Sequence, residues 1–284
     1  MRSGGSTFSP FRPPISTPNP PRRPAQEVGT EGDRREEHMA RFNMLEREVE
    51  SLLDDLSTAL AQRRPWSLVR LGDGEVHALR SNKPPWSLWG NYAETQDDVI
   101  CLRAGMLGAI ERADWVGRNK SDLHDATLRW FCDQGMLKFP EARIVDGYIN
   151  LWIVWSTRFN EMVLRNESLF LAGKPMQQWL EEVLRPRGLA GNASLYGGKT
   201  EIHGAADAQA VCDAFQASGA HVGLFSLGVW ALGIADYAKS IGRVGIDFGH
   251  GPEAGLTGIP PEPPRIVEIP RRPGAGRAKS TLGP

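Results

Sequence analysis

Two carboxylates separated by a single glycine follow an apolar run in the sequence "SLVRLGDGEVHAL". If this segment is extended, the side chains of Asp73 and Glu75 point to the same side. Both carboxylates can then reach one divalent cation, Mg²⁺ or Mn²⁺, which prefers oxygen ligands. Gly72 and Gly74 leave the backbone open for the approach of phosphate groups, and Arg70 can pair with a phosphate through its planar guanidinium group.

The same residues also fit an ordinary turn between a strand and a helix. Asp-Gly is common in turns, Asp73 would make a good helix N-cap, and Glu75 in a first helical turn suits the helix dipole. Spacing alone leaves both interpretations open. The additional Arg70 and second glycine, Gly74, favour a functional site.

Further polar residues follow other predicted strands. In an open parallel sheet, ligands lie outside the carboxyl ends of the strands, so we expect these residues to line a site together. Asp247 and His250 follow the last strand, where His250 either binds a substrate phosphate or sugar or closes a turn. Asn150 either points toward the same cleft or caps a helix. The segments expected at this edge are 72–75, 173–175, 226–228 and 247–250.

Helix and strand patterns alternate through the middle of the chain, residues 37–257. An amphipathic helix comes first, and short apolar strands separated by helices of about 10 to 15 residues follow it. This alternation predicts β-α-β crossovers, and therefore an α/β fold with a Rossmann-like parallel sheet that carries helices on both faces. The expected strands are residues 66–71, 113–117, 142–147, 168–173, 193–197, 221–228 and 243–249.

Prolines are concentrated at the two ends of the chain. Of 21 prolines, seven lie in residues 1–36 and seven in residues 258–284. Both ends also mix arginine, serine and glycine with few large apolar residues, which favours disorder over a packed core. We therefore expect a single domain, 37–257, between two disordered Pro/Arg-rich tails.

Composition narrows the class of protein. The 284 residues are 40% hydrophobic and 24% charged, as is typical of soluble globular proteins, and the net charge of −1 does not indicate a nucleic-acid partner. Three widely separated cysteines argue against disulfides and a structural zinc site. We expect no membrane span, because no apolar run approaches about 20 residues. We also expect no secretory signal, and hence a cytoplasmic protein.

Several familiar motifs are missing from the sequence. No G-x-G-x-x-G follows the first strand, and neither G-x-x-x-x-G-K-[ST] nor G-x-S-x-G occurs. This disfavours a dinucleotide dehydrogenase, a P-loop NTPase and an α/β-hydrolase.

The segment "RLGDGE", residues 70–75, resembles the R-x-G-D-G-E signature of the GT-D-type glycosyltransferases, a bacterial family long carried as a domain of unknown function. The resemblance continues in "AIERADWVG" (109–117), in "LFLAGKPM" (169–176) and in residues 224–251, which end in a similar D-x-G-H. It therefore covers most of residues 66–251. Leu71 stands where the family often has an aromatic residue.

The resemblance implies a metal-dependent hexosyltransferase that moves a hexose from a nucleotide diphosphate sugar to a glycan or glycoconjugate acceptor. In this family the D-x-E carboxylates are associated with the divalent metal and the donor diphosphate, and they correspond to Asp73 and Glu75. The metal would neutralise charge on the departing nucleoside diphosphate. An inverting enzyme would also need a general base, for which Asp247 and Glu75 are the candidates.

Two other functions remain open on the sequence. The same acids would serve a metal-dependent phosphoesterase or nucleotidyltransferase, although two-metal chemistry usually needs more carboxylates or histidines than Asp247 and His250 add. A non-catalytic module that binds a nucleotide sugar is the other alternative.

Overall fold

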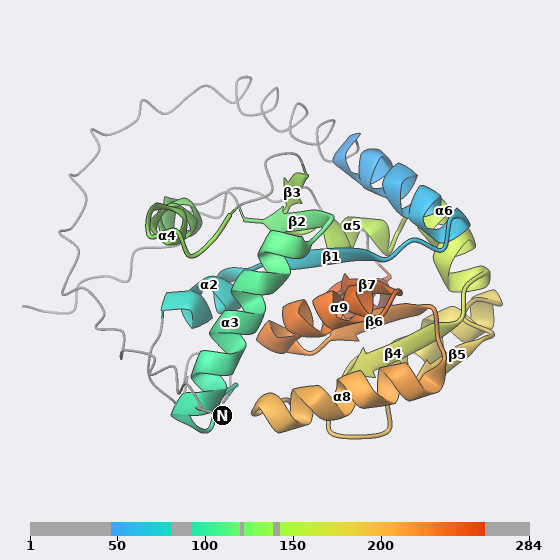
Figure 1. The fold of residues 1–284 in the computed structure, drawn as a ribbon. Coiled ribbons are helices and arrows are strands. Elements are labelled where there is room, and N and C mark those ends of the chain that lie inside the picture. The colour runs from blue at the N-terminus through green and yellow to red at the C-terminus, as the bar shows by residue number, and fades with distance from the viewer. Residues whose placement is uncertain (1–46, 81–91, 120–121, 139–142, 259–284) are drawn as a thin grey trace, which may run out of the picture. The chain divides into compact units, whose positions relative to one another are not determined.

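The computed structural model describes residues 47–80, 92–119, 122–138 and 143–258 (Figure 1). The two predicted tails lie outside these ranges, apart from Gly258. The first described helix covers residues 47–61. The strands are β1 (Trp66–Leu71), β2 (Trp115–Arg118), β3 (Ile144–Asp146), β4 (Leu169–Gly173), β5 (Ala193–Leu195), β6 (Val222–Ser226) and β7 (Val244–Asp247). The further α-helices are α2 (Asp73–Arg80), α3 (Gln96–Arg112), α4 (Asp122–Asp133), α5 (Ile149–Ile153), α6 (Thr157–Phe159), α7 (Met176–Trp179), α8 (Ala205–Ser218), α9 (Ala231–Ser240) and α10 (Gly251–Thr257).

The strands of the described residues form one seven-stranded sheet in the order β3-β2-β1-β7-β6-β4-β5. Every neighbouring pair is parallel. The first and last strands of the chain lie side by side in the middle of the sheet, with Leu68 opposite Ile246. Their carboxyl ends, and that of β2 beside β1, therefore meet at one edge of the sheet.

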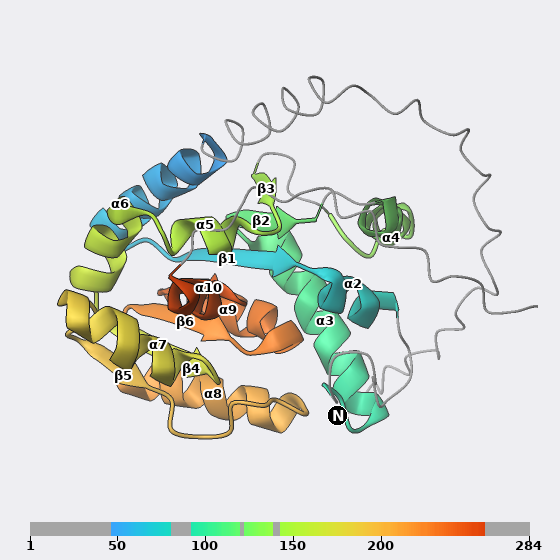
Figure 2. The ribbon, with the colours of Figure 1, turned by 180° about the vertical axis from the view of Figure 1, so that it is seen from behind.

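Helices cover both faces of the sheet, as the alternating sequence pattern predicts. Side chains of successive strand residues point to opposite faces. In β1, Val69 and Leu71 pack into the core under α3, α8 and α9 (Figure 1). Trp66 and Leu68 pack into the opposite core, under the helix 47–61, α5 and α7 (Figure 2). The predicted α/β class with a parallel sheet is confirmed.

Short irregular helices complete two of the crossovers. Helix α6 continues into a π-helix, η1 (Asn160–Arg165), and α7 continues into a π-helix, η2 (Leu180–Leu184), and a 3₁₀ turn, η3 (Arg185–Arg187). A further 3₁₀ turn, η4 (Gly228–Trp230), leads from β6 into α9. The sequence predicts single helices at these places, and it predicts no helix for α10, which follows β7 directly. None of the described helices combines the length and apolar character that crossing a membrane requires.

The helix 47–61 is hydrogen-bonded both to the amino ends and to the carboxyl ends of the strands. At its carboxyl-terminal half, the Asp55 carboxylate accepts hydrogen bonds from the indole Nε1 of Trp66 at 2.8 Å and of Trp115 at 2.9 Å. At its beginning, the Glu48 carboxylate accepts a hydrogen bond of 2.7 Å from the backbone N–H of Asp146, the last residue of β3. The start of this helix therefore lies at the carboxyl edge of the sheet.

Candidate functional site

The predicted motif 72–75 forms the start of helix α2. The carbonyl oxygen of Gly72 accepts the first helical hydrogen bond, from Val76 N at 3.1 Å, so Gly72 is the N-cap. Glu75 reaches back, and its Oε2 accepts a hydrogen bond of 2.8 Å from Gly72 N, as the third residue of a capping box does. A Cβ at Gly72 would lie 2.8 Å from this oxygen. The glycine therefore leaves the room that Glu75 needs.

This local structure corrects one sequence-based expectation. Asp73 and Glu75 lie in a helical turn and not in an extended segment, and residues two apart on a helix do not face each other. Asp73 is also the first helical residue and not the N-cap. The two carboxylates therefore leave α2 in different directions, one toward solvent and one into the protein.

Glu75 is the buried carboxylate of the pair. Burial raises the pKa of Glu75, and the nearby Asp247 carboxylate raises it further, while Arg70 opposes both effects. Burial also raises the pKa of the Tyr92 phenol, and the negative charge of Glu75 raises it further. The charge of Glu75 therefore acts on Tyr92, while Glu75 itself is affected by Asp247, the last residue of β7.

Asp73 is the exposed carboxylate, with a side chain that is 72% accessible. Its Oδ1 lies 2.9 Å from Nε2 of His124, a fully buried histidine of α4. The amide of Asn119, directly after β2, donates to the same oxygen at 3.5 Å. One oxygen of Asp73 is thus held by neighbouring elements at a position that solvent can reach.

Arg70 is bound within the protein and joins three strand ends. Its Nη1 donates to Asn150 Oδ1 at 2.7 Å and to the carbonyl oxygen of Gly147 at 3.1 Å. Its Nε lies 3.6 Å from Asp247 Oδ1, and its backbone N–H donates to Asp247 Oδ2 at 3.2 Å. The two side chains are only 11% and 2% accessible. Arg70 therefore connects β1 with β7 and with the turn after β3.

The segment after β7 is shaped around the Arg70 guanidinium group. Burial raises the pKa of Asp247, and the charge of Arg70 opposes this rise. Gly249 has a positive φ of 42°, and a Cβ there would lie 1.9 Å from Arg70 Nη2. Asn150 donates through Nδ2 to the carbonyl oxygen of Phe248 at 2.8 Å. Glycine is thus required at position 249 both by the backbone conformation and by contact with Arg70.

His250 and Gly74 lie toward the outside of this arrangement. The His250 side chain is 84% accessible, and its Nδ1 is 3.5 Å from Glu253 Oε1 on α10. The hydrogen bond to Glu253 raises the pKa of His250. At Gly74 a Cβ would meet only Val229, at 3.5 Å. Contact with this neighbour therefore does not require glycine at 74, whereas Glu75 requires it at 72.

The sequence matches the family model of the GT-D fold-like domain over residues 47–254. The chain belongs to the GT-D-like family. The matched region contains all the residues described above, from Arg70 to His250, and family membership supports a glycosyltransferase. No curated protein matches the sequence.

Solved structures of low sequence identity were also found for this GT-D-like protein. One is a structure of domain of unknown function 1792 with a distinct glycosyltransferase fold; it is 15% identical, the match covers 75% of this chain and 83% of that one, and the TM-score is 0.45. Another is a glycosyltransferase of the same domain from Streptococcus sanguinis, 15% identical, with 74% and 85% covered and a TM-score of 0.46. A selenomethionine structure of the domain gives 14% identity, 75% and 83% covered, and a TM-score of 0.46.

The GT-D-like site brings together some of the predicted residues and places others apart. Arg70, Asn150 and Asp247 form one buried cluster, and Glu75 lies within its electrostatic reach. Asp73 and His250 lie in exposed positions. Sequence reasoning missed His124 and Asn119, which both contact Asp73, and Tyr92, whose pKa the charge of Glu75 raises. Asn119 directly follows β2, so the strand-end rule would have found it.

The donor atoms at Asp73 fit a cation that arrives bound to a diphosphate. Among the described residues, no group of three or more His, Cys, Asp and Glu side chains is arranged to hold a metal ion. Mg²⁺, however, is commonly bound by one or two carboxylates together with substrate phosphates. The accessible, oriented carboxylate of Asp73 meets that requirement, and the N-terminus of α2 beside it favours anions.

Proposed function

We propose that this GT-D-like protein is a metal-dependent glycosyltransferase that moves a hexose from a nucleotide diphosphate sugar to a glycan or glycoconjugate acceptor. The observation that carries the proposal is the accessible carboxylate of Asp73 at the N-terminus of α2, which the buried His124 of α4 holds in place. This arrangement lies at the carboxyl edge of a parallel sheet, where ligands of open α/β proteins bind.

The donor diphosphate would lie at the first turn of α2. There the start of the helix and its dipole favour phosphate oxygens, and Gly72 and Gly74 present little side-chain bulk. Asp73 would hold Mg²⁺ or Mn²⁺ together with these oxygens, while His124 and Asn119 keep its carboxylate in place. A bound cation supplies charge neutralisation for the departing nucleoside diphosphate.

The buried cluster of Arg70, Asn150 and Asp247 would hold the start of α2, and with it Asp73, in position. Arg70 and Asn150 hold the ends of β1, β3 and β7 together, and they thereby position the start of α2. Of the two candidates for a general base, Glu75 fits better: it lies in the first turn of α2 beside Asp73, and its raised pKa brings a proton acceptor closer to neutral pH. Asp247 is bound to Arg70 and is only 2% accessible. His250, on the accessible rim, would contact the sugar or phosphate of the substrate.

Incubation with a panel of nucleotide sugars, with Mn²⁺, with Mg²⁺ or with chelator, tests the proposal through the release of nucleoside diphosphate. We expect metal-dependent release by the parent protein and a loss of orders of magnitude in Asp73→Asn, because the amide replaces an anionic oxygen ligand of the metal. Glu75→Gln should also lower release strongly, because it removes a candidate general base. Asp97→Asn is the matched control, since Asp97 is an exposed acid in the first turn of α3.

The other outcomes identify the alternatives. Release of inorganic phosphate or sugar phosphate would replace the proposal with a phosphoesterase or nucleotidyltransferase. Binding of nucleotide sugars without any turnover would make the protein a binding module. Full activity in Asp73→Asn would contradict the role given to this carboxylate.

A further inference from the structure

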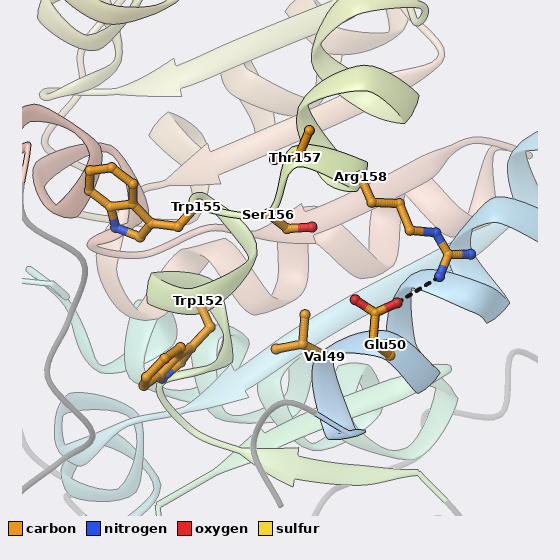
Figure 3. A pocket seen from close by; sticks show the side chains of 7 residues that line it. All are labelled: Val49, Glu50, Trp152, Trp155, Ser156, Thr157 and Arg158. Atoms are coloured by element: carbon orange, nitrogen blue, oxygen red, sulfur yellow. Dashed lines mark hydrogen bonds and ion pairs between the residues drawn. The ribbon is translucent and has the colours of Figure 1, made fainter. Parts of the chain in front are cut away.

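A cavity of about 450 Å³ lies between the helix 47–61 and the chain that leads from α5 into α6. Figure 3 shows the indole rings of Trp152 and Trp155 on one side of it and the ion pair of Arg158 with Glu50 on the other. Val49, Ser156 and Thr157 complete its lining. The cavity thus combines two large aromatic surfaces with hydroxyl, carboxylate and guanidinium groups.

The cavity lies next to the candidate site along the chain. Helix α5 begins one residue after Tyr148, and its second residue, Asn150, binds Arg70. Tyr148, with an accessibility of 41%, is four residues from Trp152, so the two aromatic rings share one side of the helix. Trp152 is roughly 3 Å beyond Asn150 along the helix axis. Residues two apart leave a helix in different directions, so α5 presents Asn150 to Arg70 and Trp152 to the cavity.

The other wall connects to the same edge of the sheet. Val49 and Glu50 directly follow Glu48, whose carboxylate binds the backbone N–H of Asp146 at the end of β3. The next residue, Gly147, supplies a carbonyl oxygen to Arg70. Both walls of the cavity are thus attached to residues that contact or adjoin Arg70.

The charges in the cavity do not suit a phosphate. Arg158 is the one cation among the lining residues, and it is already paired with two carboxylates, Glu50 at 3.0 Å and Asp54 at 2.7 Å. The excess negative charge of Glu50 and Asp54 would repel an anionic ligand, whereas it would not repel a neutral one. Hydroxyl groups can both donate to the Glu50 carboxylate and accept from Arg158.

A neutral saccharide matches each of these features. Its ring has apolar C–H faces that can stack on indole rings, and aromatic side chains offer a large rigid surface for such contact. Its hydroxyl groups can bind the few polar groups that fix orientation in a ligand pocket. We propose that this cavity binds a neutral sugar unit of the acceptor glycan. The proposal rests on the glycosyltransferase function and adds the place where the acceptor is held.

Direct binding to an array of neutral oligosaccharides tests this subsite independently of catalysis. We expect the parent protein to bind at least one of them, and Trp152→Ala and Trp155→Ala to weaken that binding about tenfold or more through the loss of a stacking surface. Trp152→Phe and Trp155→Phe should retain most of the affinity, because they keep an aromatic face. Trp130→Ala is the matched control, a partly buried tryptophan that packs in the opposite core.

Calorimetric titration of a panel of nucleoside diphosphates, in the presence of Mn²⁺, separates this subsite from the donor site. The tryptophan variants should bind the diphosphates as the parent does. The proposal would be overturned if the parent bound no oligosaccharide. It would also be overturned if both alanine variants bound an oligosaccharide as tightly as the parent does. Loss of nucleoside diphosphate binding in the alanine variants would overturn it as well, because the cavity would then hold the donor. Failure of the glycosyltransferase function itself would be read separately, as no release of nucleoside diphosphate from any nucleotide sugar.

Discussion

Replacing Arg70 by methionine removes the charge that accompanies Asp247 in the protein interior. Methionine preserves much of the length of the side chain and its apolar stem, but it offers no donor to Asn150 or Gly147. The Asp247 side chain is only 2% accessible, so water cannot replace the guanidinium group. We expect a strongly destabilised protein that nevertheless keeps the parallel sheet.

The magnitude follows from the contacts that are lost. Leaving one partner of a buried ion pair without the other costs about 3–5 kcal/mol. The Asn150 oxygen, which loses a hydrogen bond of 2.7 Å, adds about 1–3 kcal/mol if it stays unsatisfied. For a domain of this size, such a loss corresponds to a decrease in Tm on the order of 10 to 25 °C.

A second substitution identifies the buried charge as the cause. Asp247→Asn in the Arg70→Met background should recover most of the ion-pair cost, because asparagine is neutral and can still accept from the backbone N–H of residue 70. The pH dependence gives the same information. Without Arg70, the pKa of Asp247 rises further above its unfolded value, so the folded state binds the proton more tightly. The loss of unfolding free energy in Arg70→Met should therefore be smallest at about pH 4. It should grow as the pH rises through the pKa of Asp247 in the folded variant.

Denaturant-induced unfolding, followed by circular dichroism at several pH values, measures the free energy of unfolding of four proteins. These are the parent, Arg70→Met, Asp247→Asn and the double variant. Arg165→Met serves as the control, because its ion pair with Glu161 is about half exposed on both sides and should contribute at most about 0.5 kcal/mol. A loss in Arg70→Met no larger than this control, or no recovery by Asp247→Asn, would refute the assignment of Arg70 as the buried partner of Asp247.

Three further predictions concern the neighbouring residues. His124→Phe should lower kcat roughly 10- to 100-fold by releasing Asp73, an effect typical of groups that orient a metal ligand; unchanged kinetics would count against that orientation. Because burial raises the pKa of Glu75, the unfolding free energy of the parent should fall as the pH rises through that pKa, and Glu75→Gln should flatten this dependence; equal slopes would contradict it. Gly249→Ala should cost more than about 2 kcal/mol in denaturant unfolding, because the new Cβ meets Arg70 at a positive φ; a neutral effect would show that Arg70 can move away.

The fold could be predicted because its strands and helices have strong periodic patterns. Each expected strand overlaps an observed one, and the alternation of helix and strand was sufficient for the parallel sheet. Helix α10 was missed since its seven residues include two glycines and a proline, which are typical of a turn. The π-helices were missed because hydrophobic spacing does not distinguish them from an α-helix over a single turn.

The candidate site was predictable where position along a strand determines contact. Asp247 and Arg70 end neighbouring strands, so topology alone brings them together. The geometry of Asp73 and Glu75 was not predictable in this way. The N-cap is Gly72, which has no side chain to signal a capping box, and the fold-back of Glu75 decides where the helix begins. His124 belongs to a helix and not to a strand end, so only the packing of α4 against α2 reveals its contact with Asp73.

The pairing of the first strand with the last has a consequence for synthesis on the ribosome. The hydrogen bond from Arg70 N to Asp247 joins residues 177 positions apart. At about 5–20 residues per second, the partner of β1 is therefore translated on the order of 10 to 35 seconds later. During that interval one edge of β1 lacks its neighbour, and an open strand edge invites pairing with other chains. Nascent chains that end before Val244 should consequently depend on chaperones more than the completed protein does.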